Sequence, residues 1–221
     1  MALPLTGVTG DNAAMRYRRA VQKLRLLAVA CQSTRLPVDE PFLHEAYVFG
    51  GVLDGADPVE SVQVALALNL SPEEVPWCSQ PPGTAWLVDS LRLDKGGFAY
   101  WWRSRHEPVW NHVIRDPVRF WSLDGTDESV LDTLRDRRFA DLPRATASPA
   151  DLRQRVELEL DRALAQLHTV DQKYWDRDWR GEHGGGGRYP ENHLWEAVDG
   201  YLDLLGAVDA VSGRDRAQGG G

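Results

Sequence analysis

Apolar side chains recur at helical spacing before the first cluster of prolines. The series is Tyr17, Val21, Leu24, Ala28 and Cys31. Steps of three or four residues are the period of an amphipathic helix, so this segment is predicted to be helical. Asp11 and Asn12 are both suitable N-caps, which places the expected start of the helix near them.

The rest of this helix surface is basic. Its charged residues are Arg16, Arg18, Arg19, Lys23 and Arg25. Such a run of charge is typical of a solvated helix face. The alternative interpretation is a patch that binds phosphate or an acidic partner.

Two longer helices are predicted in the last third of the chain. Ser148, Pro149 and Asp151 form a strong helix start, with serine as the cap and proline in the first turn. Apolar residues continue this helix at Leu152, Val156, Leu160, Leu164, Leu167 and Tyr174. Glycines 184–187 interrupt it as a hinge, and a second stripe follows at Leu194, Val198, Tyr201, Leu202, Leu205 and Val208. We therefore expect an antiparallel helical hairpin over residues 146–212.

The region before the hairpin mixes strands and helices. Residues 43–49 and 62–66 are predicted strands joined through Gly50-Gly51, and alternation predicts another strand over 98–103. Residues 85–93 fit a strand or a short helix, and 128–138 fit a short helix. The predicted fold class is α+β: a small mixed β-sheet with flanking helices in a domain over 11–145, followed by the hairpin. Residues 1–10 and 213–221 are expected to be flexible tails.

The segment Tyr47–Gly55, with Ser61-Val62-Gln63-Val64 after it, resembles the signature of the nucleotidyltransferase superfamily. In that family a strand ends in Gly-Ser, and the next strand bears two carboxylates one residue apart. The small turn lets backbone N–H groups approach nucleotide phosphates. Carboxylates at alternate positions face the same side of a strand and can hold the Mg²⁺ that stabilises the transferred phosphoryl group.

This chain departs from the signature at the positions that carry the chemistry. Gly51 stands in place of the serine, and Ser61 and Gln63 stand in place of the carboxylates. Shifting the alignment by one residue places Val62 and Val64 there instead. Asp89 is the candidate third carboxylate if residues 85–93 form a strand. The resemblance therefore implies the superfamily's fold without a metal site, a catalytic residue or a cofactor, although Gly-Gly between two strands is also an ordinary hairpin device.

Composition narrows the classes of partner and compartment. The net charge is −8 and the pI about 5.2, which disfavours extended nucleic-acid binding. The two cysteines, Cys31 and Cys78, are too few and too far apart for a disulfide framework or a zinc ribbon. The first residues lack the pattern of a secretory signal, and no stretch reaches the roughly 20 apolar residues of a membrane helix. A cytoplasmic protein without membrane contact is expected.

Two sets of residues are candidates for binding. Trp and Arg interleave over 98–121, which suggests a pocket wall that stacks on a ligand and pairs with anions. The predicted ligand-binding residues are Gly50, Gly51, Ser61, Gln63, Trp102, Arg103 and Arg105. Aromatic residues alternate with charges over 174–183, which is typical of an interface. Its candidate contact residues are Trp175, Trp179 and Arg180.

The leading functional hypothesis is a non-catalytic nucleotidyltransferase-like module that binds a protein partner or a nucleotide. One alternative is an active enzyme with a phosphate-bearing substrate. Another is one component of a toxin–antitoxin or phage-defence pair, because Arg162 and His168 resemble the Arg-x₄₋₆-His motif of HEPN ribonucleases.

Overall fold

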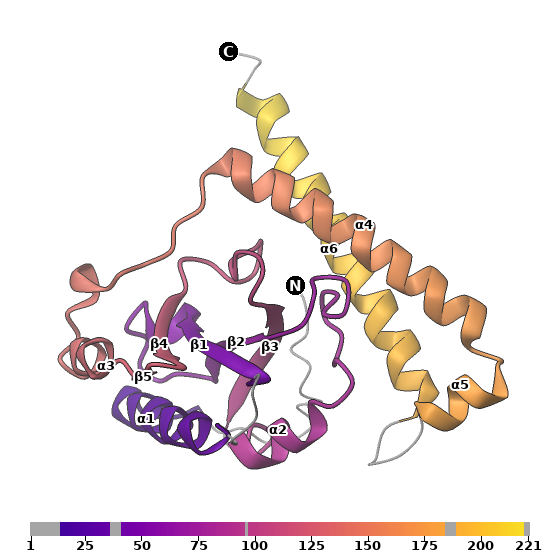
Figure 1. The fold of residues 1–221 in the computed structure, drawn as a ribbon. Helices are drawn as coiled ribbons and strands as arrows, with labels where there is room; N and C mark the ends of the chain where they lie inside the picture. Colours follow the sequence, from indigo (N-terminus) through magenta and orange to yellow (C-terminus); the bar gives the residue numbers. More distant parts are fainter. Residues whose placement is uncertain (1–13, 36–40, 96, 184–188, 219–221) are drawn as a thin grey trace.

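A five-stranded mixed sheet forms the centre of the molecule (Figure 1). The computed structural model describes residues 14–35, 41–95, 97–183 and 189–218. The strands are β1 (Leu43–Phe49), β2 (Val62–Leu68), β3 (Phe98–Ser104), β4 (Val118–Ser122) and β5 (Gly125–Thr126). They lie in the order β3-β2-β1-β4-β5. Strands β2 and β3 are parallel and the other pairs are antiparallel, which confirms the predicted mixed sheet.

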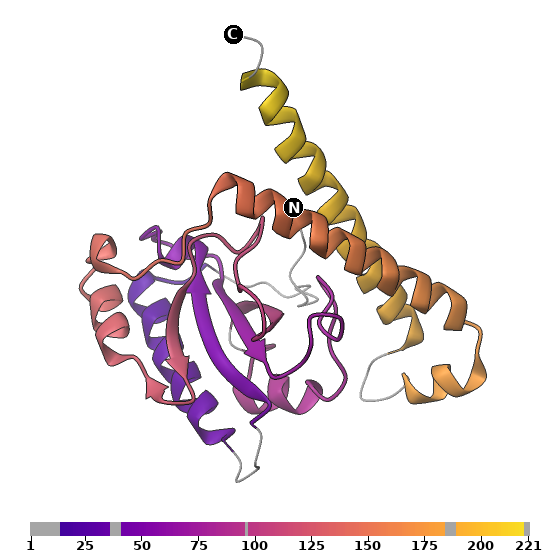
Figure 2. The same ribbon diagram turned by 45° about the horizontal axis from the view of Figure 1, so that its top comes forward.

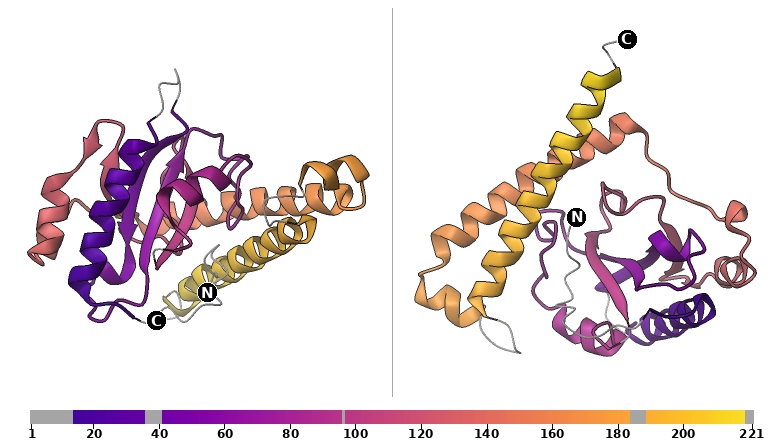
Figure 3. Two further views of the ribbon diagram at one scale, coloured as in Figure 1. Left: turned by 90° about the horizontal axis from the view of Figure 1, so that it is seen from below. Right: turned by 180° about the vertical axis from the view of Figure 1, so that it is seen from behind.

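Helices cover both faces of this sheet. They are α1 (Tyr17–Ser33), α2 (Ala85–Leu91), α3 (Glu128–Arg135), α4 (Pro149–Lys173), α5 (Arg177–Glu182) and α6 (Pro190–Gln218). Short 3₁₀ turns lie at Gly50–Val52 and Phe139–Asp141. Helices α1 and α2 lie on one face, and the C-terminal hairpin of α4 and α6 lies on the other (Figure 3). The architecture is therefore α+β, with the hairpin packed against the sheet.

Helix α1 is amphipathic as predicted, but it begins later. Its buried residues include Tyr17, Leu24 and Leu27, which pack toward the sheet. The N-cap is Arg16, whose side chain makes no cap hydrogen bond. The backbone N–H of Tyr17 instead donates to Oδ1 of Asp57 at 3.3 Å, so a residue distant in sequence caps the helix. Asp11 and Asn12 lie outside the described residues.

The predicted strands at 43–49, 62–66 and 98–103 are present, and β2 and β3 continue to Leu68 and Ser104. The ambiguous residues 85–93 contain helix α2. Two parallel neighbouring strands need a long crossover connection, and α2 lies in the crossover between β2 and β3. Strand β4 was not predicted. Pro117 obscured the segment, although exposed Arg119 between buried Val118 and Phe120 is the pattern of a strand.

Most tryptophans contribute to the core, as their number suggested. The side chains of Trp77, Trp101, Trp102, Trp121 and Trp179 are buried. Trp121 and Phe49 are among the largest side chains that are fully buried. Trp86, Trp175 and Trp195 are exposed and are left for other roles.

The two long helices of the C-terminal hairpin run antiparallel and pack along their length (Figure 2). Ser148 caps α4 by accepting from the N–H of Asp151, as the sequence indicated. Helix α6 continues to Gln218, past the predicted boundary at residue 212, and its C-terminal end extends beyond the start of α4 (Figure 2). The predicted hinge at 184–187 lies outside the described residues. Within the described ranges, no helix combines the length and apolarity that a bilayer crossing needs.

Candidate functional site

The Gly50-Gly51 turn and Gln63 come together as predicted, but the glutamine fills the turn. Gly50 has φ of +65° and follows Phe49, which pairs with Gln63 across β1 and β2. The N–H of Gly51 donates to Oε1 of Gln63 at 3.3 Å. This is the kind of backbone donor that would approach a phosphate in a nucleotidyltransferase, so an amide from the chain itself now takes that place.

The positions expected to carry carboxylates hold none. Ser61 lies just before β2, and Gln63 is paired with Ala99 of the neighbouring strand β3. Val62 and Val64 are fully buried in the core. The candidate third carboxylate, Asp89, lies on helix α2 and not on a strand, so its predicted role is wrong. Within the described ranges, no three His, Cys, Asp or Glu side chains are grouped so that they could hold a metal ion.

The interleaved Trp and Arg residues do not form one pocket wall. Successive side chains of a strand alternate between its faces, so β3 separates Trp102 from Arg103. Trp102 is buried, and its ring contacts that of Tyr100 on the same face. Arg105 lies just past the strand end, exposed, with its Nη1 at 2.8 Å from Nδ1 of His44. The seven predicted ligand-binding residues therefore belong to at least three separate environments.

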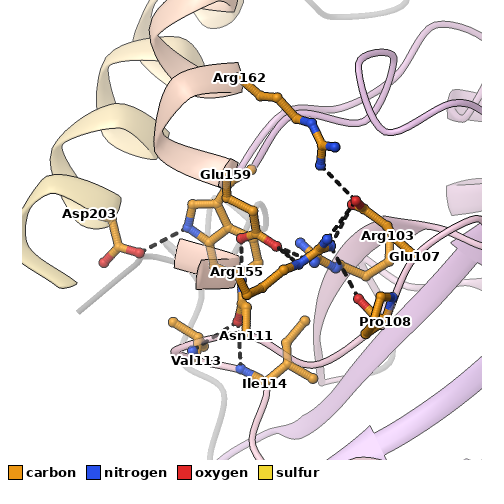
Figure 4. Close-up of polar contacts among 11 residues, drawn as sticks. Arg103, Glu107, Pro108, Asn111, Val113, Ile114, Arg155, Glu159, Arg162 and Asp203 are labelled. Atoms are coloured by element: carbon orange, nitrogen blue, oxygen red, sulfur yellow. Dashed lines mark hydrogen bonds and ion pairs between the residues drawn. The ribbon is translucent and has the colours of Figure 1, made fainter. Parts of the chain in front are cut away.

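Arg103 belongs to a buried ionic cluster where the sheet meets α4 (Figure 4). Its Nη2 is hydrogen-bonded to Oε1 of Glu159, and both side chains are nearly inaccessible, at 2% and 4%. Nε of Arg155 lies 2.7 Å from the same Glu159 oxygen. Nδ2 of Asn111 donates to the other Glu159 oxygen at 2.9 Å. Glu159 thus holds two arginines and one amide in the interior.

A second carboxylate extends this cluster toward the surface. Oε1 of Glu107 lies 2.5 Å from Nη2 of Arg155, and its Oε2 lies 2.6 Å from Nη1 of Arg162. We call the five charged residues Arg103, Glu107, Arg155, Glu159 and Arg162 the junction network. His168, which the motif comparison paired with Arg162, is exposed on α4.

The charges of the junction network keep its carboxylates ionised. Burial alone would raise the pKa of Glu159, but Arg103 and Arg155 outweigh it and hold the pKa below its usual value. The pKa of Glu107 is lowered in the same way, by Arg155 and Arg162 against the effect of burial. The guanidinium groups are committed to these carboxylates, so the network joins the hairpin to the sheet and offers no free base.

A second contact joins α6 to the loop after β2. Oδ2 of Asp203 accepts from Nε1 of Trp77 at 2.9 Å and lies 2.6 Å from Nε2 of His112. Gly200, one turn earlier, lies directly against the carbonyl oxygen of Trp77. Trp77 also stacks parallel to Trp101 of β3, with ring centroids 6.4 Å apart. The hairpin is therefore docked through polar contacts at two places.

Neither cysteine is placed to act as a nucleophile. Cys31 and Cys78 are both buried, and burial raises the pKa of each thiol well above its ordinary value. At neutral pH both thiols are protonated and behave as small apolar side chains.

Of the three interface candidates, only Trp175 is available for contact. Its side chain is 83% exposed. Trp179 is buried against Val170 and Ala197. Nη2 of Arg180 lies 3.1 Å from Oε1 of Glu191, so this arginine links α5 to the start of α6.

A larger exposed apolar surface lies on α6 and was not predicted. Trp195 is 65% exposed and Leu202 is 56% exposed, with Leu205 beside them at 37%. We call these three residues the α6 stripe. They lie seven and three residues apart, which places them on one face of the helix. The sequence pattern had merged Leu202 and Leu205 with the inward-facing Leu194 and Tyr201, because α6 is apolar on two adjacent sides.

Acidic residues border the α6 stripe. Glu191, Asp199 and Asp209 are exposed on the same helix. Between Pro190 and Val211 the sequence contains no lysine or arginine. The outer face of α6 is therefore both apolar and negatively charged.

Residues 15–210 match the model of a family described as a domain of unknown function, DUF7711. The chain belongs to this family. The match extends over the sheet, α1 to α5 and most of α6, so the hairpin is part of the family's domain. No curated protein and no solved structure matches the chain.

The Gly50 turn of this DUF7711 domain gives a direct test of its geometry. We expect Gly50→Ala to lower the free energy of unfolding by about 1–2 kcal/mol, because residues with a Cβ are strained at positive φ. An added Cβ would also lie 1.7 Å from Oε1 of Gln63, so the amide must move away from the N–H of Gly51. Urea denaturation of the variant measures the loss.

Gly51→Ala is the matched control for this prediction. Its added Cβ would meet only Cβ of Ala56, at an ordinary contact distance of 3.7 Å. We expect a change within about 0.5 kcal/mol. Equal losses in the two variants would show that the turn does not depend on the left-handed backbone of Gly50.

Proposed function

We propose that this chain is a non-catalytic nucleotidyltransferase-like module that binds a protein partner through the α6 stripe. The order of elements supports the first part. An initial helix, α1, precedes two antiparallel strands joined through a glycine turn, and α2 then leads to a third strand parallel to the second. The Gly50-Gly51 turn stands between β1 and β2, where the superfamily has its Gly-Ser.

The lack of catalysis is argued from Gln63. Its amide accepts from the N–H of Gly51, and the adjacent position on β3 is Ala99. Phosphoryl and nucleotidyl transfer by this superfamily depends on metal ions held by carboxylates. A glutamine amide and an alanine methyl group cannot replace two carboxylates as ligands of Mg²⁺.

The observation that carries the binding role is the exposure of Trp195 and Leu202 on one helix face. Exposed large apolar side chains that gather on one face mark contact surfaces, and tryptophan is enriched among residues that dominate binding energy. The partner's chemistry follows from the border of the stripe. Because Glu191, Asp199 and Asp209 are acidic, the fitting surface is apolar with lysine or arginine at its rim.

The binding role is tested by comparing what the full chain retains from the cells that produce it. Wild type, a Trp195→Ser/Leu202→Ser variant and a Leu158→Ser control are each immobilised, and bound proteins are quantified by mass spectrometry. Leu158 is a matched control because it is exposed at 45% on α4, outside the α6 stripe. We expect a partner that wild type and control retain and that the double variant loses by about tenfold or more.

Circular dichroism must first show that all three proteins are folded. A set of retained proteins that is the same for all three would contradict the role of the α6 stripe. If the retained partner is the chain itself, the stripe is a self-association surface, and the proposal of a separate basic partner is overturned.

The non-catalytic part is tested separately by calorimetry. ATP, GTP, CTP and UTP are each titrated with and without Mg²⁺. We expect Mg²⁺ not to strengthen the binding of any of them, because the described residues provide no group of metal ligands. Binding that becomes tenfold tighter with Mg²⁺ would show a metal site and would contradict this part of the proposal.

A further inference from the structure

The first half of α1 and the turn after α3 enclose a groove of about 570 Å³, on the side of the molecule where these helices lie next to each other (Figure 1). The residues that line it are Arg16, Tyr17, Arg18, Val21, Gln22, Arg25, Asp57, Arg135, Asp136 and Arg137. Five of these ten are arginines and two are aspartates, in a chain whose net charge is −8. We call this site the arginine groove.

The basic residues of α1 run along the groove. Arg18, Gln22 and Arg25 are four and three residues apart, so they share one face of the helix over about 10 Å. Arg135 and Arg137 follow from the end of α3 and the turn after it, on the other wall. Donors from two elements therefore face a common space that is elongated along α1.

Three of the guanidinium groups are held in place by acidic partners. Arg25 places its two Nη atoms at 2.5 Å from Glu128 and Asp132 of α3. Arg137 lies over the ring of Tyr17 at 4.2 Å and pairs with Asp57 at 3.1 Å. Arg135 is paired with both Asp132 and Asp136. These contacts orient the walls of the groove before any ligand binds.

Two arginines at the entrance have no such partner. Arg16 and Arg18 are exposed, and neither forms an ion pair within the part of the chain that the structure describes. They flank the N-terminus of α1, whose first turn contains no acidic residue. The positive end of the helix dipole adds to the field of the arginines. The entrance to the groove therefore carries positive charge that the described residues do not neutralise.

We propose that the arginine groove binds a ligand that carries a linear polyphosphate group. Guanidinium groups match phosphate oxygens with paired hydrogen bonds, and an elongated row of them suits several linked phosphates better than one. The volume of about 570 Å³ is that of a small-molecule site. This site lies on α1 and α3, apart from the Gly50-Gly51 turn and from the α6 stripe, so it does not depend on the function proposed above.

Calorimetry with the full chain at 150 mM salt tests this inference. Inorganic tripolyphosphate, ATP and inorganic phosphate are titrated into wild type, an Arg16→Ala/Arg18→Ala variant and an Arg92→Ala/Lys95→Ala control. The control removes two exposed positive charges that line a different groove, between α1 and α2. We expect tripolyphosphate to bind wild type and control equally, at least tenfold more tightly than inorganic phosphate, and to bind the first variant at least tenfold more weakly.

The arms of the experiment also identify the source of the polyphosphate. ATP that binds more tightly than tripolyphosphate indicates a nucleotide, and equal binding indicates the polyphosphate group alone. Absence of tripolyphosphate binding, or equal weakening in variant and control, would overturn the inference. A single-stranded oligonucleotide that binds when tripolyphosphate does not would overturn it too, in favour of a nucleic-acid surface.

Discussion

Glu159→Ala is expected to lower the free energy of unfolding by about 3–5 kcal/mol. The carboxylate is fully enclosed between Arg103, Arg155 and Asn111. Removing it leaves two guanidinium groups in the interior without their shared counter-ion, and the cost of a buried unpaired charge far exceeds the value of an exposed ion pair. Urea denaturation at pH 7 measures the loss.

Glu157→Ala is the matched control, since Glu157 is exposed on the same helix. Its expected effect is within about 0.5 kcal/mol. If the two variants unfolded at the same denaturant concentration, Glu159 would not be the centre of the contact between α4 and the sheet.

The junction network also makes stability depend on pH. The pKa of Glu159 and that of Glu107 are lower in the folded chain than in the unfolded chain. A carboxyl group with a lowered pKa stabilises the fold above its unfolded pKa, and that stabilisation is lost as the pH falls through the folded value. Below about pH 4.3, the ordinary pKa of glutamate, wild type should therefore lose stability more steeply than Glu159→Ala.

Gly200→Ala is expected to lower the free energy of unfolding by about 1–3 kcal/mol, which reverses the usual effect of this substitution in a helix. Alanine normally stabilises a helix interior by about 1 kcal/mol relative to glycine. At position 200, however, the new Cβ would lie 2.3 Å from the carbonyl oxygen of Trp77. Backbone cannot move aside as a flexible side chain can, so α6 must shift away from the loop.

Gly206→Ala provides the control on the same helix. Gly206 is exposed, and an added Cβ there would meet nothing within 4 Å. This variant should therefore be more stable than wild type by about 0.5–1 kcal/mol. Opposite signs in the two denaturation curves support close docking of α6 on the Trp77 loop, whereas stabilisation by both variants would contradict it.

Local periodicity determined most of the secondary structure of this chain. The spacing of apolar residues in α1, α4 and α6 is a property of each segment, because a helix must bury one side of itself wherever it lies. The Ser148 cap of α4 is equally local. The Gly50-Gly51 turn was predicted from two neighbouring strands, and the position of Gln63 beside it follows from their pairing.

Tertiary structure decided which charges are free and which are buried. Arg103 and Arg105 differ little as residues in a sequence, yet one is enclosed by Glu159 of α4 and the other contacts His44 at the surface. No pattern in β3 contains this difference, since it depends on the helix that packs over the strand more than 50 residues later. The same holds for Trp179 and Trp195, which packing of the hairpin buries and exposes respectively.

The sequence by itself determined an α+β chain with a helical hairpin, a glycine turn between two strands and no paired carboxylates after it, because these depend on residue type and short spacing. Only the tertiary structure decided that Gln63 closes the turn, that an outer face of α6 is apolar and exposed, and that arginines from α1 and α3 line one groove. These features require segments far apart in the sequence to pack together, and local patterns do not specify such packing.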